Sequence, residues 1–389
     1  MASPRTAPAP HTPNGGLEEL RDLFDLVDGI ADKELAPRAA EYEARGEFPR
    51  EQLRLLGRAG LLGLPFPAEY GGGGQPFEVY VQVLERIARR WLVPAQAINV
   101  HTLSCLPLAA FGSEQQRADW LPGFLGGEVL GANCMSEPEV GSDLSTIGTT
   151  AARDPAGGDG YTVTGTKSWV SHAGIADYYN IYCRTGGPGP RGISVLLADA
   201  RTPGILPQRK ERKMGARSSP TAQVVLDAVQ VPAERLIGRP GRGFLIALDV
   251  FDLGRMSIAA CAVGLAQAAL DYAVQYAKTR HQFGQPVFEF QGVSFPLADT
   301  ATRIAASRAL VRDAARTKDQ GGRCSTAAAQ AKLFATETAM QATLDAVQVL
   351  GAYGYVEDHP VERWMREAKL LQIIEGTNQI QRVAISRSL

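Results

Sequence analysis

Hydrophobic residues recur at helical spacing in the first third of the chain. Four of them near its start lie three or four positions apart, on one face of a helix: Leu17, Leu20, Phe24 and Val27. The same kind of pattern predicts a second helix from Phe77 to about Arg90. Residues 16–128 are therefore predicted to form an N-terminal helical domain.

The pattern changes near Val129, where apolar runs become short and rich in β-branched residues. Four such runs are typical of strands: residues 161–165, 178–183, 193–198 and 222–231. Segments rich in Gly and Pro separate them, as at residues 185–192. Because these strands do not alternate with helices, a dinucleotide-binding fold of the Rossmann type is excluded. Residues 129–238 are predicted to form a small all-β domain.

Helical spacing returns after the Gly-rich segment at residues 238–243. Six residues then advance by three or four positions along one helix face: Ile258, Ala262, Leu265, Ala269, Tyr272 and Tyr276. Ala-rich amphipathic stretches follow at about residues 295–318 and 325–350. We expect residues 239–389 to form a helical bundle, so that the domains follow one another in the order α, β, α.

Composition limits what such a protein can do. A chain of 389 residues is expected to form two or three domains. Its 45% hydrophobic and 21% charged residues are typical of a soluble globular protein. The formal net charge of −1 gives no overall field that would recruit nucleic acid or an anionic membrane. No apolar stretch approaches the roughly 20 residues that span a bilayer.

The chain start, the cysteines and the histidines bear on the location of the protein and on metal binding. Residues 1–15 are rich in Pro, Ala and small polar residues, fit neither a signal nor a transit peptide, and are predicted to be a disordered lead-in. The five cysteines are isolated and show no CxxC spacing, which indicates a reducing, cytoplasmic location. The five histidines show no metal-ligand spacing, so we predict no metal site.

Four segments carry residues suited to chemistry rather than to packing. They are NCMSEPEVGSD (133–143), KSWVSHAG (167–174), RHQFGQPVFEFQ (280–291), and QVLGAYGY (348–355) taken with IIEGTNQIQR (373–382). In this order and spacing the chain resembles the acyl-CoA dehydrogenase family of flavoproteins, over about residues 17–387. The resemblance implies an α+β multidomain fold, with an N-terminal α-helical domain, a middle β-barrel-like domain and a C-terminal four-helix bundle.

The resemblance also implies an FAD held between the β domain and the bundle. Ser136 would donate a hydrogen bond to the flavin ring, Trp169 would stack near it, and Ser171 would lie close to N5. Arg280 resembles the arginine that meets the pyrophosphate, for which a guanidinium is well shaped. The other expected FAD contacts are Asn133, Cys134, Met135, Gly141, Ser142, Val170, Phe283, Gln291, Gln348, Val349, Leu350, Gly351, Ala352, Thr377, Asn378 and Gln379. The residues alone leave open a core aromatic for Trp169 and a surface charge for Arg280.

Glu375 matches the family's catalytic base, which takes the α-proton of an acyl thioester while the β-hydrogen leaves as hydride to flavin N5. Apolar residues precede it, and a carboxylate in such surroundings has a raised pKa that suits a base. Some relatives carry the base in an earlier helix, at the position of Gly254, which has no side chain to serve. By the same likeness, four residues are expected to bind the substrate: Ser142, Asp252, Arg255 and Gly376.

The predicted activity is FAD-dependent α,β-dehydrogenation of an acyl-CoA. Three alternatives remain: a dehydrogenase of acyl groups on carrier proteins, a flavin monooxygenase or oxidase, and a non-catalytic scaffold, which would not need Glu375. The resemblance further implies a homo-oligomer, either a tetramer or a dimer, in which residues 348–352 approach the neighbour's FAD. An electron-transfer flavoprotein is the expected electron acceptor, and neither nucleic acid nor a membrane is an expected partner.

Overall fold

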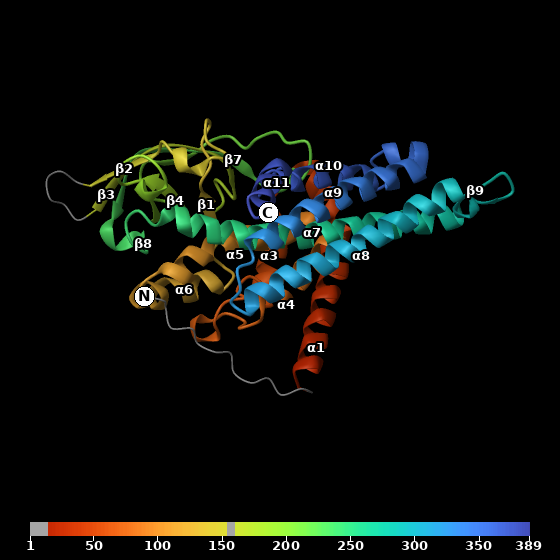
Figure 1. Cartoon of the computed structure of the whole chain (residues 1–389), viewed down its shortest axis with the longest axis horizontal. Coiled ribbons are helices and arrows are strands. Elements are labelled where there is room, and N and C mark those ends of the chain that lie inside the picture. Colours follow the sequence, from red (N-terminus) through yellow and green to blue (C-terminus); the bar gives the residue numbers. More distant parts are fainter. Residues whose placement is uncertain (1–14, 154–159) are drawn as a thin grey trace.

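The computed structural model describes residues 15–153 and 160–389. Most of the predicted lead-in, residues 1–14, lies outside this part. Helices come first, then a sheet, then helices again, which confirms the predicted α, β, α order (Figure 1). The N-terminal helices are α1 (Gly15–Ile30), α2 (Ala39–Arg45), α3 (Arg50–Arg58), α4 (Phe77–Arg90), α5 (Leu92–Phe111) and α6 (Glu114–Leu125).

Helices α4 and α5 link the N-terminal domain to the rest of the core. The α4 helix has the bounds that the apolar spacing predicted, and it starts directly after Pro76. Its first backbone amides, at Phe77 and Glu78, donate to the carboxylate of Asp319 at the end of a C-terminal helix. An acceptor of this kind satisfies helix N-H groups that have no partner within the helix. The α5 helix is buried on nearly all sides and runs through the interior.

The middle domain is one curved sheet. Its strands are β1 (Gly131–Cys134), β2 (Thr150–Arg153), β3 (Gly160–Ser171), β4 (Tyr178–Arg184), β5 (Ile193–Asp199), β6 (Ile205–Pro207), β7 (Thr221–Pro232) and β8 (Leu236–Ile237). The order is β6-β7-β3-β2-β4-β5-β8, and β1 pairs with β4 in parallel. The long strands β3 and β7 are antiparallel neighbours. Among the described residues the sheet stays open, so the barrel-like domain is not a closed barrel.

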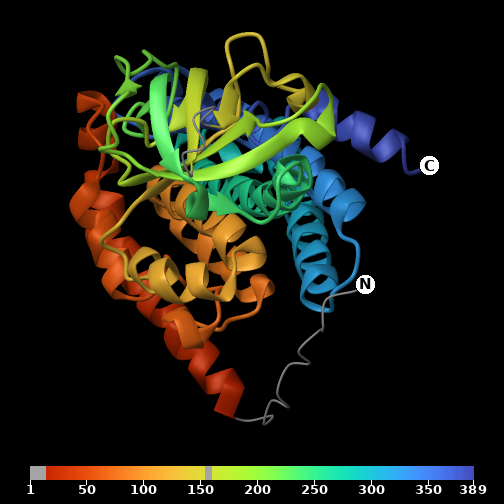
Figure 2. The same cartoon turned by 90° about the vertical axis from the view of Figure 1, so that its left-hand side faces the viewer.

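Three long helices dominate the C-terminal domain. They are α7 (Gly243–Thr279), α8 (Gln291–Asp319) and α9 (Ser325–Leu350), followed by the shorter α10 (Val361–Leu371) and α11 (Asn378–Ser386). The hairpin of β9 (His281–Gln282) and β10 (Gln285–Pro286) joins α7 to α8. The sheet lies across one side of the helices, as Figure 2 shows. None of the helices in the described residues is both long and apolar enough to cross a membrane.

Candidate active site

Glu375 lies in the short turn between α10 and α11. Its backbone φ is +53°, and that of the following Gly376 is +85°. Two left-handed residues in succession reverse the chain sharply, and the first is strained because a side chain disfavours this region. Gln381 holds the turn: its Nε2 donates to the carbonyl oxygen of Glu375 at 3.2 Å and to that of Gly376 at 2.8 Å. The turn is therefore fixed from inside the protein.

The Glu375 carboxyl group packs against α7 at Gly254. A β-carbon added at Gly254 would lie 2.4 Å from Oε2 and 2.9 Å from Cδ, so the carboxyl occupies the space that any other residue would fill. Burial raises the pKa of the Glu375 carboxyl to about 7, against the opposing effect of the charges of Arg255 and Lys332. A carboxyl with this pKa can accept a proton and release it again near neutral pH. An exposed loop glutamate is excluded by this placement.

Arg255 and Asp252 flank Gly254 on α7. Arg255 Nη1 donates to Asp252 Oδ1 at 2.9 Å, and the hydroxyl of Ser325 also bonds to the Asp252 carboxylate. Burial raises the pKa of Asp252, although these two contacts oppose the rise. The structure thus brings both predicted substrate-binding residues of α7 to the helix turns beside Glu375. Ser142 lies on the β domain and is exposed.

The residues that follow Glu375 face mainly inward. The Thr377 side chain caps α11 by accepting a hydrogen bond from the Ile380 amide at 3.3 Å. Asn378 is buried, and its Oδ1 accepts from Lys332 Nζ at 2.9 Å and from the Thr336 hydroxyl at 3.0 Å. Gln379 is exposed. Of the three predicted FAD contacts here, Asn378 has its side-chain oxygen engaged within the protein.

The segment from Asn133 to Ser142 runs beside β3 and is held there by a buried lysine. Lys167 Nζ donates to the carbonyl of Met135 at 3.2 Å, to that of Tyr182 at 2.6 Å and to Glu137 Oε1 at 2.8 Å. Two of these acceptors belong to the segment itself and the third to β4. The lysine therefore ties the segment to both strands from inside the domain.

A backbone contact fixes the same segment a second time. The Ser168 amide on β3 donates to the Ser136 carbonyl at 2.9 Å. This bond uses only the backbone of Ser136, so its side chain is not needed to hold the segment in place. The arrangement is compatible with the predicted role of that hydroxyl as a donor to a ligand.

Within this group the side chains point in different directions. Cys134 and Val170 are buried in the core of the β domain, so that they can offer a ligand only their backbone. Burial also raises the pKa of the Cys134 thiol to about 12. Trp169 is 65% exposed with a φ of +59°, next to a register shift in the pairing of β3 with β7. The interpretation of Trp169 as a core aromatic is therefore wrong.

The other predicted FAD contacts lie at the far end of the helices. Arg280 and Gln291 are exposed at the two ends of the β9–β10 hairpin, and Phe283 at its tip is 93% exposed. Residues 348–350 end α9 and residues 351–352 follow it. They lie near the end of α7, because the rings of Tyr276 and Tyr353 pack with centroids 6.5 Å apart. Figure 1 shows this hairpin at one end of α7 and the β domain toward the other.

The length of α7 separates the two groups. Arg280 follows Gly254 by 26 positions, which corresponds to about 39 Å along a helix. The predicted FAD contacts outside the Glu375 turn therefore fall into two groups, which we call half-sites. One half-site lies on the β domain (residues 133–142 and 169–171), and the other at the hairpin end of α7 (Arg280, Phe283, Gln291 and residues 348–352). The structure does not bring the two half-sites together within one chain.

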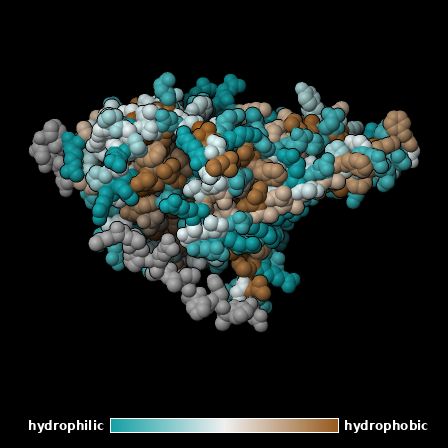
Figure 3. Space-filling view, in the orientation of Figure 1, coloured by the Kyte–Doolittle hydropathy of each residue, from teal (hydrophilic) through white to brown (hydrophobic). Residues whose placement is uncertain are grey.

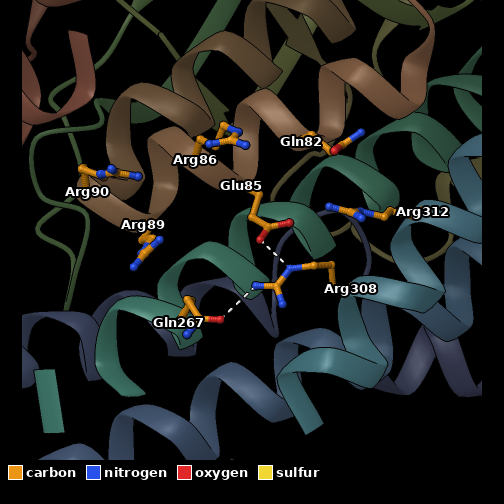
Figure 4. A pocket seen from close by; sticks show the side chains of 8 residues that line it. All are labelled: Gln82, Glu85, Arg86, Arg89, Arg90, Gln267, Arg308 and Arg312. Carbon is orange, nitrogen blue, oxygen red and sulfur yellow. Dashed lines mark hydrogen bonds and ion pairs between the residues drawn. The ribbon is translucent and has the colours of Figure 1, made fainter. Parts of the chain in front are cut away.

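A hollow lined by arginines lies elsewhere, between α4, α7 and α8 (Figure 4). Arg308 there donates to Glu85 at 2.7 Å and to Gln267 at 3.0 Å. Gln267 follows Gly254 by 13 positions on α7, or about 20 Å. Four of the five arginines that line the hollow pair with carboxylates, those of Glu85, Asp28, Asp32 and Asp271. The hollow is therefore separate from the site at Glu375.

Family models match all three domains of the chain. The acyl-CoA dehydrogenase N-terminal domain matches residues 17–128, the middle domain residues 132–229, and the C-terminal domain residues 241–389. The chain belongs to the acyl-CoA dehydrogenase family. It is an oxidoreductase that uses FAD to dehydrogenate acyl-CoA thioesters, as the sequence motifs predicted. The exposed indole of Trp169 suits contact with a flat flavin ring.

Individual members of the family are similar over almost their whole length. An acyl-CoA dehydrogenase of Bacillus subtilis is 42% identical, covering 94% of this chain and 96% of the relative. A cyclohexane-1-carbonyl-CoA dehydrogenase of Geobacter metallireducens is 40% identical, covering 96% and 97%. The solved butyryl-CoA dehydrogenase of Megasphaera elsdenii superposes with a TM-score of 0.92 at 37% identity, covering 95% and 97%.

Three residues of this site were missing from the sequence prediction. Lys167 lies within a predicted motif, but its burial depends on carbonyl groups from two other segments. Lys332 is the one basic residue of the Ala-rich helix α9 and is fully buried. Tyr182 of β4 is also fully buried, and its hydroxyl has no hydrogen-bond partner within the described residues. A charged or polar residue on an otherwise apolar face was the one signal that the sequence offered.

Proposed function

We propose that Glu375 is the base that removes the α-proton of the acyl thioester. The observation that carries this proposal is the position of its carboxyl group, packed against Gly254 with a pKa raised to about 7. At neutral pH a large fraction of such a carboxyl is ionised and able to accept a proton. Bound FAD supplies the acceptor for the hydride that leaves the β-carbon. Family membership alone supports the reaction; the geometry supports Glu375 as the residue.

The residues around Glu375 support a role in orienting the substrate. We propose that Asp252, Arg255 and the Gly376 backbone line the site of the thioester arm, with Ser142 reaching it from the β domain. Arg255 places a positive charge beside the carboxylate, which favours the ionised base over the neutral acid. The strained turn at Glu375 and Gly376 is consistent with a side chain held in a working position rather than a relaxed one.

We also propose that one FAD is shared between two copies of the chain. Ser136, Trp169 and Ser171 would hold the ring in one copy, and Arg280, Gln291 and residues 348–352 would approach the same FAD from another. The separation of the half-sites along α7 supports a homo-oligomer, a dimer or a tetramer. Figure 3 shows apolar atoms at the tip that carries β9 and β10, where the exposed Phe283 lies. A monomer in light scattering with full FAD occupancy would contradict the proposal.

The experiment for the base uses purified, FAD-loaded protein under anaerobic conditions. Butyryl-CoA, cyclohexane-1-carbonyl-CoA and a butyryl thioester on a carrier protein are mixed with it in turn, and bleaching of the flavin is followed. At least one CoA thioester is expected to reduce the flavin, and Glu375→Gln should slow that reduction by at least about a hundredfold. FAD content and binding of the thioester should persist in the variant, because the amide has nearly the same shape.

Two results would contradict parts of this proposal. If Glu375→Gln bleached its flavin at the native rate, the base would be another residue. If only the carrier-bound thioester were oxidised, the substrate class would be acyl-carrier proteins instead of acyl-CoA.

The electron acceptor and the location are the remaining proposals. We propose an electron-transfer flavoprotein as acceptor, and fast reoxidation of the reduced protein by oxygen alone would favour an oxidase instead. We also propose a cytoplasmic location, which the five buried free thiols support because disulfides are rare in reducing compartments. Recovery of the protein in a secreted fraction would contradict that location.

A further inference from the structure

Lys332 is a charged side chain in the interior of the C-terminal domain. It lies on α9, and none of its surface is exposed. Removing an ammonium group from water is costly unless hydrogen bonds and opposite charge compensate it. Lys332 Nζ donates to the Gly376 carbonyl and to Asn378 Oδ1, each at 2.9 Å. One acceptor lies in the turn that carries Glu375 and the other belongs to the first residue of α11, so the residues that follow Glu375 compensate the buried charge.

We propose that Lys332 is a positioning residue for Glu375, which fixes the turn that presents the carboxylate at Gly254 and favours its ionised form. This inference rests on the proposed role of Glu375 as the base. The two hydrogen bonds support the fixing of the turn, because they hold the residues one and three positions after Glu375. The positive charge of Lys332 supports the ionised form, because it lowers the pKa of the Glu375 carboxyl.

The charges around Glu375 show in which direction Lys332 moves the pKa of the Glu375 carboxyl. Lys332 of α9 and Arg255 of α7 both lower the pKa of the Glu375 carboxyl, against the larger effect of burial. Asp252 of α7 pairs with Arg255, and the negative charge of Glu375 contributes to raising the pKa of Tyr182 on β4. Burial in turn lowers the pKa of Lys332 to about 7; the Glu375 charge opposes this effect and the Arg255 charge adds to it. Removing the Lys332 charge should therefore raise the pH at which Glu375 loses its proton.

The fold is expected to survive the loss of this lysine, because each acceptor has a second donor. The Gly376 carbonyl also accepts from Gln381 Nε2 at 2.8 Å, and Asn378 Oδ1 also accepts from the Thr336 hydroxyl at 3.0 Å. Thr336 thus offers a matched control. Thr336→Val removes a hydrogen bond to the same Asn378 oxygen, from the same helix, without changing any charge.

The test measures the ionisation of Glu375 directly in the FAD-loaded protein. Glutamate labelled with ¹³C at the carboxyl is incorporated, and infrared difference spectra or ¹³C NMR follow protonation against pH. The signal of Glu375 is assigned by its disappearance in Glu375→Gln. Lys332→Met is expected to move its midpoint up by about one pH unit. Thr336→Val and Lys332→Arg, which keep the charge, should leave the midpoint near the native value.

Flavin reduction by butyryl-CoA or cyclohexane-1-carbonyl-CoA gives a second readout. The rate of flavin reduction should rise with pH, and in Lys332→Met the midpoint of this rise should shift to higher pH together with the carboxyl midpoint. An unmoved midpoint in folded Lys332→Met, or an equal shift in Thr336→Val, would overturn the inference. That failure is distinct from failure of the proposed base, which would appear as native flavin reduction by Glu375→Gln.

Discussion

Replacing Gly254 with alanine would put a methyl group where the Glu375 carboxylate lies. The added carbon would be 2.4 Å from Oε2, 2.9 Å from Cδ and 3.1 Å from Cδ1 of Leu103. Atoms that are not bonded come to rest at about 3.5 Å or more, so the carboxylate must retreat by about 1 Å. A shift of about 1 Å in a reacting group can cost about a hundredfold in rate. We therefore expect Gly254→Ala to slow flavin reduction by about ten- to a hundredfold.

Stability should change far less than activity in this variant. Alanine is favoured over glycine inside a helix by about 1 kcal/mol. The groups that must move are the ends of two flexible side chains, those of Glu375 and Leu103, and not backbone. The cost of moving them and the gain in helix propensity nearly offset each other. The free energy of unfolding of Gly254→Ala should thus stay within about 1 kcal/mol of the native value.

The assay pairs anaerobic stopped-flow reduction of the flavin with denaturant unfolding. Gly123→Ala on α6 is the control, because a β-carbon there meets nothing within 4 Å. It should stabilise the protein slightly and leave reduction unchanged. Flavin reduction at the native rate by Gly254→Ala would contradict this expectation, since the carboxylate could then work from another position. Loss of folding in the variant would refute the claim that only side-chain ends are displaced.

Two further variants test the buried lysine of the β domain and the far half-site. Lys167→Met should destabilise the protein by about 3–5 kcal/mol in denaturant unfolding, because the buried Glu137 carboxylate loses its positive partner and keeps only the backbone amides of Gly148 and Thr149 as donors. Adding Glu137→Gln should recover part of this loss, and a cost below about 1 kcal/mol for the single variant would contradict the account. Arg280→Ala should lower the FAD content per chain more than Arg280→Lys, which keeps the positive charge. Equal flavin absorbance in the two Arg280 variants would show that this charge does not hold the cofactor.

The elements that could be predicted from the sequence are those set by local periodicity. The bounds of α4 coincide with the predicted segment, and α9 runs from Ser325 to Leu350 as expected. Both helices are marked by breaks, at Pro76 before α4 and at Gly351 after α9. The four predicted strands were also found, within β3, β4, β5 and β7. In each case the signal lies in residues close together along the chain.

The features that could not be predicted depend on residues far apart in sequence. The residues alone left open a core position for Trp169, and no feature of the strand's own sequence indicates its exposure beside the register shift between β3 and β7. Lys332 is buried because its acceptors come from residues more than 40 positions later. The resemblance assigned only residues 348–352 to the neighbour's FAD, and sequence order does not reveal that α7 also holds Arg280, Phe283 and Gln291 away from Trp169. Tertiary structure supplied what periodicity could not.

The span of α7 has a consequence for how copies of the chain can assemble. A body with complementary half-sites at opposite ends could join head to tail, and such a contact leaves one half-site open at each end of a growing filament. Pairing about a two-fold axis closes both sites at once, because each copy gives its hairpin end to the other. A shared cofactor would therefore favour a closed symmetric particle with two complete sites per pair. In such a particle, a substitution at the hairpin would empty the site of the neighbouring chain rather than its own.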